Sequence, residues 1–148
     1  MTKYPWLLAA LIVGAFLFVS SLTFAAERNV TPTVAQAGAL DGKTFVGEFG
    51  QKGKKTEGKD ELIFKDGKFH SKACDPYGFG DGVYTATVIG DTTTFETETE
   101  STKEGKIKWM GTVKGNVIDV TYTWHRSPKW YRFSNAPIEY WFKGELKK

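Results

Sequence analysis

Apolar and polar side chains alternate with a period of two from Asp41 to the end of the chain, and this pattern limits the possible folds more than any other feature. Successive side chains of a β-strand point to opposite faces of a sheet, so the alternation is typical of strands with one buried face. The pattern is carried by eight segments, at residues 43–49, 60–65, 68–74, 82–89, 92–100, 106–114, 117–125 and 138–146. No segment between them predicts an internal helix.

Compact turn sequences join several of these segments, among them Lys65-Asp66-Gly67-Lys68, Gly90-Asp91 and Gly115-Asn116, which are typical of β-hairpins. Short connections make successive strands antiparallel neighbours, and closing the meander on itself leaves no exposed sheet edge. The sequence therefore predicts an all-β fold, an eight-stranded antiparallel up-and-down meander closed as a small barrel, after an N-terminal signal or anchor helix.

The alternation also separates an apolar interior from a charged exterior. Glu96 and Glu98 share the outer face of one predicted strand, whereas Phe95 takes its inner face. A transmembrane barrel has the opposite arrangement, with an apolar band facing lipid, and is therefore excluded. The chain has 20 Lys and Arg against 17 Asp and Glu, a net charge of +3 with both signs mixed. This balance argues against a nucleic-acid-binding protein that relies on overall basic charge.

The first 26 residues predict a signal peptide. Lys3 precedes an apolar run over residues 6–19, and Thr23-Phe24-Ala25 supplies the small residues of a cleavage site. An uncleaved membrane anchor is the alternative, because about 20 apolar residues can span a bilayer. We therefore expect an exported protein, periplasmic or secreted, that contacts a membrane only through an uncleaved leader.

Residues 27–40, which include three Ala, two Thr and one Pro, are expected to form a linker, which leaves residues 41–148 as the barrel domain. Cys74 is the only cysteine of the chain, so an intramolecular disulfide is impossible and a free thiol is expected.

The longer connections of the meander all fall at one end of the predicted barrel, at residues 50–59, 75–81, 101–105 and 126–137. Ligands of small barrels enter at such a mouth, and binding residues concentrate on loops held by a rigid scaffold. The inward positions near this end are small, or are Tyr and Trp, which combine an apolar ring with one polar group. The predicted ligand-binding residues are Tyr84, Tyr122, Trp124, Tyr140, Thr97 and Thr99 inside the barrel, with Tyr77, Arg126, Trp130 and Arg132 on the loops.

The meander over residues 41–146 resembles the calycins, the small β-barrels of the lipocalin, fatty-acid-binding and avidin type. The first strand opens with Gly42-Lys43-Thr44-Phe45, where lipocalins carry Gly-x-Trp, so this chain is one residue longer there and has Phe for Trp. The resemblance implies small-molecule binding inside the barrel.

These features predict an exported protein that holds a small amphipathic or anionic ligand in the barrel mouth. The alternative is an envelope protein-interaction or structural module whose barrel is filled by its own side chains. Outward Val46 and Trp141 would then add an apolar patch for a partner protein or a homodimer.

A third hypothesis is an enzyme or metal protein centred on Cys74, Asp75 and His125, the one Cys–His grouping that the topology allows. The sequence shows no convincing nucleophile–base pair, carboxylate dyad or metal-ligand set, and no carboxylate is expected to point into the barrel. We therefore predict no enzymatic activity, no metal and no cofactor.

Overall fold

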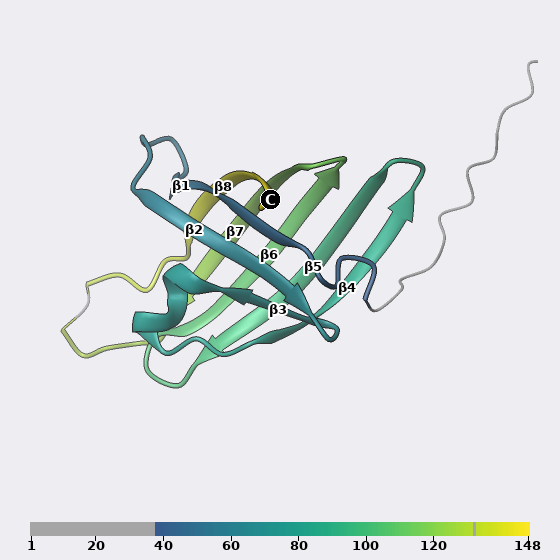
Figure 1. Ribbon diagram of the computed structural model, residues 1–148. Helices are drawn as coiled ribbons and strands as arrows, with labels where there is room; N and C mark the ends of the chain where they lie inside the picture. The colour runs from purple at the N-terminus through teal and green to yellow at the C-terminus, as the bar shows by residue number, and fades with distance from the viewer. Residues whose placement is uncertain (1–37, 132) are drawn as a thin grey trace, which may run out of the picture.

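The structure is a computed structural model that describes residues 38–131 and 133–148. One closed sheet contains all eight strands in chain order, each antiparallel to its neighbours, which confirms the predicted fold class (Figure 1). The strands are β1 (Thr44–Gln51), β2 (Gly58–Lys65), β3 (Lys68–Ser71), β4 (Gly82–Ile89), β5 (Thr92–Ser101), β6 (Gly105–Lys114), β7 (Val117–Arg126) and β8 (Ile138–Leu146).

Pairing of β1 with β8 closes the barrel, and two facing glycines make this seam possible. Gly47 lies opposite Gly144 in the register. A Cβ atom on Gly47 would lie 2.1 Å from the carbonyl oxygen of Lys143 and 2.5 Å from the Cα of Gly144. Only a residue without a side chain fits there, because both obstructing groups are backbone.

Phe64 lies at the centre of the hydrophobic core. Its ring packs edge-on against Phe45, Phe69, Tyr84 and Phe95, with ring centroids 4.9–6.1 Å apart. These side chains are at most 4 % exposed. The interior is therefore filled by aromatic rings at the end of the barrel that carries the tight turns.

Leu40 extends this core beyond the predicted barrel domain. It is fully buried, and its backbone N–H donates to the Tyr84 hydroxyl at 3.0 Å. The same hydroxyl donates to the Asp41 carboxylate at 2.8 Å. Residues 38–40, predicted as the end of a linker, thus belong to the floor of the barrel.

The strand predicted at residues 68–74 is wrong in its second half. β3 ends at Ser71, and a 3₁₀ helix, η1 (Lys72–Tyr77), follows it. The backbone N–H of Ala73 donates to the Asp60 carboxylate at 2.8 Å rather than to a neighbouring strand, and Pro76 has no N–H to donate. Side-chain competition for the backbone therefore ends this strand early.

The predicted signal peptide at residues 1–26, its anchor-helix alternative and the linker up to residue 37 lie outside the described residues. Within the described part of the chain, no helix is long and apolar enough to cross a membrane.

Candidate ligand-binding site

A cavity of about 180 Å³ opens at the end of the barrel that carries the long loops. β1, β2, η1, the segment after η1, and β6 to β8 all contribute to its wall. Its lining residues are Phe49, Glu57, Asp60, Ala73, Cys74, Tyr77, Phe79, Ile107, Tyr122, Trp124 and Tyr140. Larger hollows, such as one of about 510 Å³ over β4 to β7, lie on the outer wall of the barrel.

Stacked aromatic rings form one wall of this cavity. Tyr122 stacks on Trp109 with ring centroids 4.2 Å apart, and on Tyr140 with centroids 5.1 Å apart and planes 6° from parallel. The Trp124 indole N–H donates to the Glu104 carbonyl at 2.9 Å, so its polar group is satisfied outside the cavity lining. Phe79 meets Trp124 edge-on. The ring system is held by packing and therefore has a defined shape.

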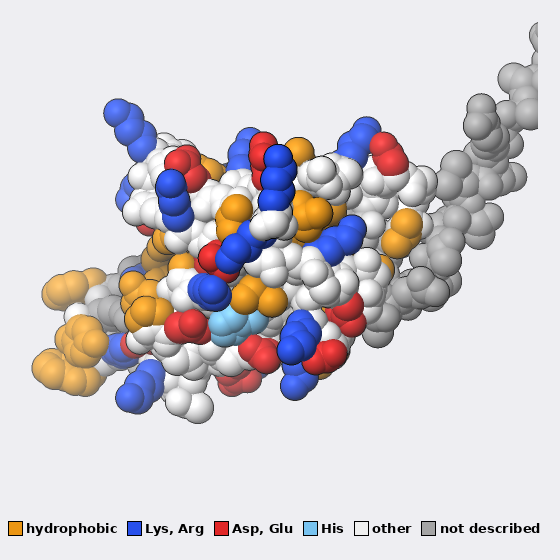
Figure 2. Space-filling model, in the orientation of Figure 1, with side chains coloured by type: hydrophobic (Ala, Val, Ile, Leu, Met, Phe, Trp, Pro, Cys, Tyr) orange, Lys and Arg blue, Asp and Glu red, His pale blue; other side chains and the backbone are white. Residues whose placement is uncertain are grey.

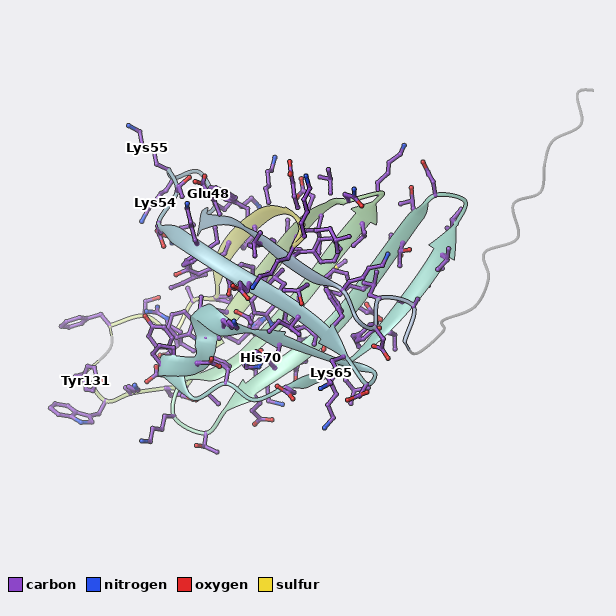
Figure 3. The ribbon with its side chains drawn as sticks, in the orientation of Figure 1. Glu48, Lys54, Lys55, Lys65, His70 and Tyr131 are labelled. Atoms are coloured by element: carbon purple, nitrogen blue, oxygen red, sulfur yellow. The ribbon has the colours of Figure 1, made fainter. Side chains whose placement is uncertain are left out.

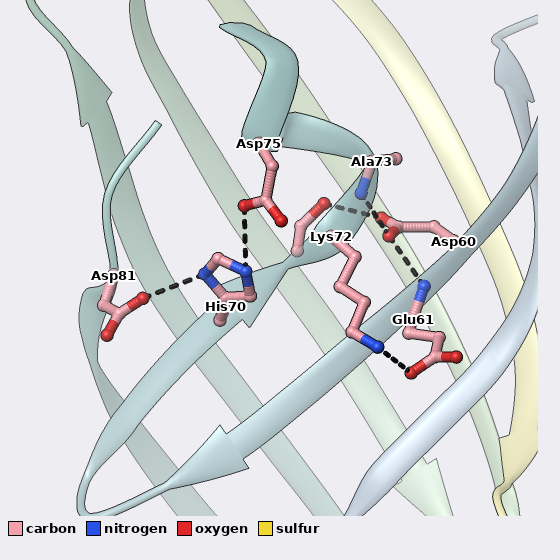
Figure 4. A network of polar contacts seen from close by, with 8 residues as sticks. Asp60, Glu61, His70, Lys72, Ala73, Asp75 and Asp81 are labelled. Atoms are coloured by element: carbon pink, nitrogen blue, oxygen red, sulfur yellow. Dashed lines mark hydrogen bonds and ion pairs between the residues drawn. The ribbon is translucent and has the colours of Figure 1, made fainter. Parts of the chain in front are cut away.

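Asp60 places a carboxylate inside the barrel. It is 8 % exposed and accepts three hydrogen bonds, from the Ser71 hydroxyl at 2.6 Å, the Glu61 N–H at 2.7 Å and the Ala73 N–H at 2.8 Å (Figure 4). Burial raises the pKa of Asp60 above its usual value, although these hydrogen bonds oppose the shift. The carboxylate joins β2 to the start of η1 and faces the cavity at the same time.

Other weakly acidic groups surround the same space. Burial raises the pKa of the Cys74 thiol to about 11, with added repulsion from Asp60 and Asp75. Burial also raises the pKa of Tyr122 strongly, and the nearby Cys74, Asp60, Tyr140 and Glu57 add to the effect. At neutral pH the thiol and the phenol are therefore protonated, and any negative charge in the cavity resides on carboxylates.

His70 holds η1 from the outer face of the barrel. Its Nε2 lies 3.0 Å from Asp75 within η1, and its Nδ1 lies 2.9 Å from Asp81 just before β4 (Figure 4). Backbone pairing between β3 and β4 joins Lys68 to Val83 and Phe69 to Gly82. Beyond this short pairing, η1 covers the barrel wall between β3 and β4. Asp60 holds η1 from inside the barrel, and His70 holds it from the outer face.

Four of the predicted ligand-binding residues meet at this cavity: Tyr77, Tyr122, Trp124 and Tyr140. Tyr77 comes from η1 and is 55 % exposed, so it lies at the cavity rim. The other three are inward residues of β7 and β8. The alternation of side chains predicted their direction, and the loop arrangement predicted their end of the barrel.

Tyr84, Thr97 and Thr99 do not line the cavity, contrary to the prediction. The Tyr84 hydroxyl lies in the barrel floor with Asp41, because β4 is displaced along β3 and Tyr84 N–H bonds to Gly67 in the β2–β3 turn. The Thr97 hydroxyl donates to the Val83 carbonyl at 2.9 Å, and the Thr99 hydroxyl accepts from the Trp109 indole at 3.0 Å. All three hydroxyls serve internal hydrogen bonds.

Arg126, the last residue of β7, and Trp130, on the loop after it, are also absent from the cavity lining. Arg126 donates to the Ser134 carbonyl at 3.0 Å, and its Nε is buried without a hydrogen-bond partner within the described residues. Trp130 is 97 % exposed at the tip of the loop. Arg132 lies outside the described residues.

The structure does not assemble the grouping of Cys74, Asp75 and His125. Cys74 falls within the strand predicted at residues 68–74, but β3 ends at Ser71 and Cys74 lines the cavity instead. Asp75 pairs with His70 instead, and exposed His125 lines a different hollow, on the outer wall. Among residues 38–131 and 133–148, no group of three or more His, Cys, Asp or Glu could hold a metal ion.

Sequence reasoning missed the two carboxylates of the cavity, Glu57 and Asp60. The expectation that no carboxylate points inward was wrong for Asp60. Asp60 precedes the inward-facing Leu62 and Phe64 of β2 at intervals of two residues. The alternation along this strand therefore indicates that the Asp60 side chain also faces inward. Glu57 lies on the β1–β2 loop, where no periodic pattern applies.

Comparisons with protein-family models, with curated proteins and with solved structures found no match. The fold and the site define a closed eight-stranded meander barrel with an aromatic cavity at its mouth.

Proposed function

We propose that this protein is an exported barrel that binds one small amphipathic ligand in its mouth cavity. The observation that carries the proposal is the cavity itself, because the aromatic side chains fill the barrel floor and leave about 180 Å³ at the loop end. Its lining combines aromatic walls with a few polar groups, as in most small-molecule sites. The resemblance to lipocalin-, fatty-acid-binding- and avidin-type barrels supports the same function.

The cavity volume limits the size of the ligand. It equals about six water molecules at liquid density and lies below the roughly 300–1,000 Å³ of sites for drug-sized compounds. The lining contains Glu57 and Asp60 but no Lys or Arg. Of the two predicted ligand chemistries, the amphipathic one is therefore favoured over the anionic one.

Native mass spectrometry tests the proposal. The protein purified from an exporting host should carry an excess mass that is lost on denaturation, and the released compound should be identifiable. Tyr122→Leu should lower the bound fraction by about tenfold, because it removes the ring stacked between Trp109 and Tyr140. A compound retained equally by Tyr122→Leu would contradict binding in this cavity.

A second candidate function is protein interaction through the tip of the β7–β8 loop. Trp130 and Phe133 are fully exposed there and Tyr131 is 58 % exposed. Apolar side chains gather at this tip on the face shown in Figure 2, and Tyr131 points away from the barrel at the same end as Lys54 and Lys55 (Figure 3). Clustered exposed rings are typical of interaction surfaces. On the outer wall Val46 is 37 % exposed and Trp141 half-buried, which is a smaller patch.

The two functions are separated by paired variants. Trp130→Ser should abolish capture of an envelope partner or self-association while leaving ligand retention unchanged. Tyr122→Leu should show the reverse. Analytical ultracentrifugation and crosslinking in the exporting host provide the readout of association, and a strictly monomeric protein without crosslinks would exclude the second candidate.

A further inference from the structure

The lining of the mouth cavity is acidic as well as aromatic. Glu57 and Asp60 supply the charged groups, and no Lys, Arg or His is among the lining residues. The Arg126 guanidinium, which lies near Tyr140, hydrogen-bonds to the Ser134 carbonyl outside the lining. A ligand in the cavity therefore meets negative charge at close range.

Within the described residues Asp60 is a buried carboxylate with no cation in direct contact, and the charge of His70 has only a small effect on its pKa. Its three hydrogen-bond donors are the Ser71 hydroxyl and the backbone N–H groups of Glu61 and Ala73, all of them neutral. Within the described residues Asp60 forms no ion pair with Lys or Arg. A carboxylate offers about four lone-pair positions, so acceptor capacity remains. A buried charge is costly unless it is paired, and a bound cation would provide that pair.

The aromatic walls favour the same kind of ligand. The faces of Tyr and Trp rings attract cations through the negative charge above the ring, and several rings around one space make an aromatic cage. Tyr122, Trp124 and Tyr140 line the space from one side, with Phe49 and Phe79 among the other lining residues. The hydroxyls of Tyr122 and Tyr140 make no hydrogen bond within the described part of the chain, so they are free to bind a polar group of the ligand.

From these observations we infer that the cavity binds a small organic cation, an ammonium group with a short substituent, held by aromatic faces and by the Asp60 carboxylate. This inference rests on the proposed function and specifies its ligand class. The volume of about 180 Å³ accepts a trimethylammonium headgroup with a short chain. Substituted ammonium ions are the cations that aromatic cages recognise.

Three matched probes test the inference by isothermal titration calorimetry on the protein purified from an exporting host and freed of bound compounds. Choline carries the cation, 3,3-dimethylbutan-1-ol is its uncharged isostere, and 3,3-dimethylbutanoate is an anion of similar size. We expect choline to bind at least tenfold more tightly than the isostere, and the anion to bind more weakly than either.

Variants of the acidic residues identify which side chains cause the preference for a cation. Asp60→Asn should fold, because the Ser71 hydroxyl can turn to accept a hydrogen bond from the new amide, and should lower choline affinity about tenfold without changing affinity for the isostere. Glu57→Gln, on an exposed loop, provides a second test that does not depend on the folding of the Asp60 variant. Glu145→Gln, an exposed acid on the outer face of β8, is the matched charge control.

The outcomes separate the two proposals. An isostere or anion that binds as tightly as choline would overturn the cationic ligand class while supporting a small-ligand site. An absence of binding by all three probes would also overturn the inference. The proposed function would then be judged separately, by whether native mass spectrometry finds an excess mass that is lost on denaturation. A choline preference that persists in both Asp60→Asn and Glu57→Gln would contradict the assigned site.

Discussion

Asp60 has a structural role that is separate from the cation binding proposed for it. Its oxygens accept hydrogen bonds from the Ser71 O–H at the end of β3 and from the N–H groups of Glu61 in β2 and Ala73 in η1. We expect Asp60→Ala to lower the free energy of unfolding by about 3 kcal/mol, because buried donors without partners cost roughly 1–3 kcal/mol each. Asp60→Asn should cost less than about 1 kcal/mol, since it retains an acceptor. Urea unfolding measures both values, and equal losses would contradict this account.

Cys74 is expected to react slowly in the folded protein. Burial raises the pKa of its thiol from 9.0 to about 11, so the thiolate fraction at pH 8 falls by on the order of 100-fold. Alkylation by iodoacetamide at pH 8 should be slower than in the urea-unfolded chain by at least this factor. The rate in the folded state should increase up to about pH 11. A rate that levels off below pH 9 would show that the thiol is not buried as described.

At the scale of elements, His70 is one of the side chains that hold η1, together with Asp60. His70 contacts Asp75 within η1 and Asp81 at the start of β4. His70→Ala should release this segment, so hydrogen exchange over residues 72–81 should become faster by an order of magnitude or more. His125→Ala, an exposed histidine of β7, is the matched control and should leave the exchange unchanged. If both variants exchange alike, Asp60 alone is sufficient to hold η1.

The sequence predicted the strands well and η1 poorly, for a physical reason. The alternation of side chains is a local signal, and it continued through Ala73 and Cys74 as though β3 did not end. The carboxylate that ends the strand belongs to Asp60, thirteen residues earlier in the chain. A long-range side-chain bond of this kind has no periodic signature. The inward direction of Cys74 could therefore not be predicted.

At the scale of the whole molecule, the short connections were sufficient to predict the closed meander, and the cavity opens at the end where they placed the long loops. They were not sufficient to predict how far one strand is displaced along the next. The pairing of Phe69 with Gly82 places Tyr84 level with the β2–β3 turn, so its hydroxyl joins the floor instead of the mouth. Tyr122 and Tyr140 face each other directly across β7 and β8, and both were predicted correctly for the cavity side.

Closure of the barrel depends on the close approach of β1 and β8 at Gly47 and Gly144. Gly47→Ala would place a Cβ atom 2.1 Å from a backbone oxygen of β8, and backbone cannot turn aside as a flexible side chain can. We expect a loss of about 3 kcal/mol or more in the free energy of unfolding, at the upper end of the cost of overpacking. Urea unfolding measures this loss.

Gly80→Ala is the control for this prediction, because nothing lies within 4 Å of its added Cβ and its φ lies outside the left-handed region. It should change the free energy of unfolding by less than about 0.5 kcal/mol. The same seam carries Phe49 on β1 and Tyr140 on the adjacent β8, and both line the cavity. Gly47→Ala should therefore also weaken ligand binding, even though Gly47 does not line the cavity. Equal stability of the two variants would mean that β1 and β8 do not close the barrel in this register.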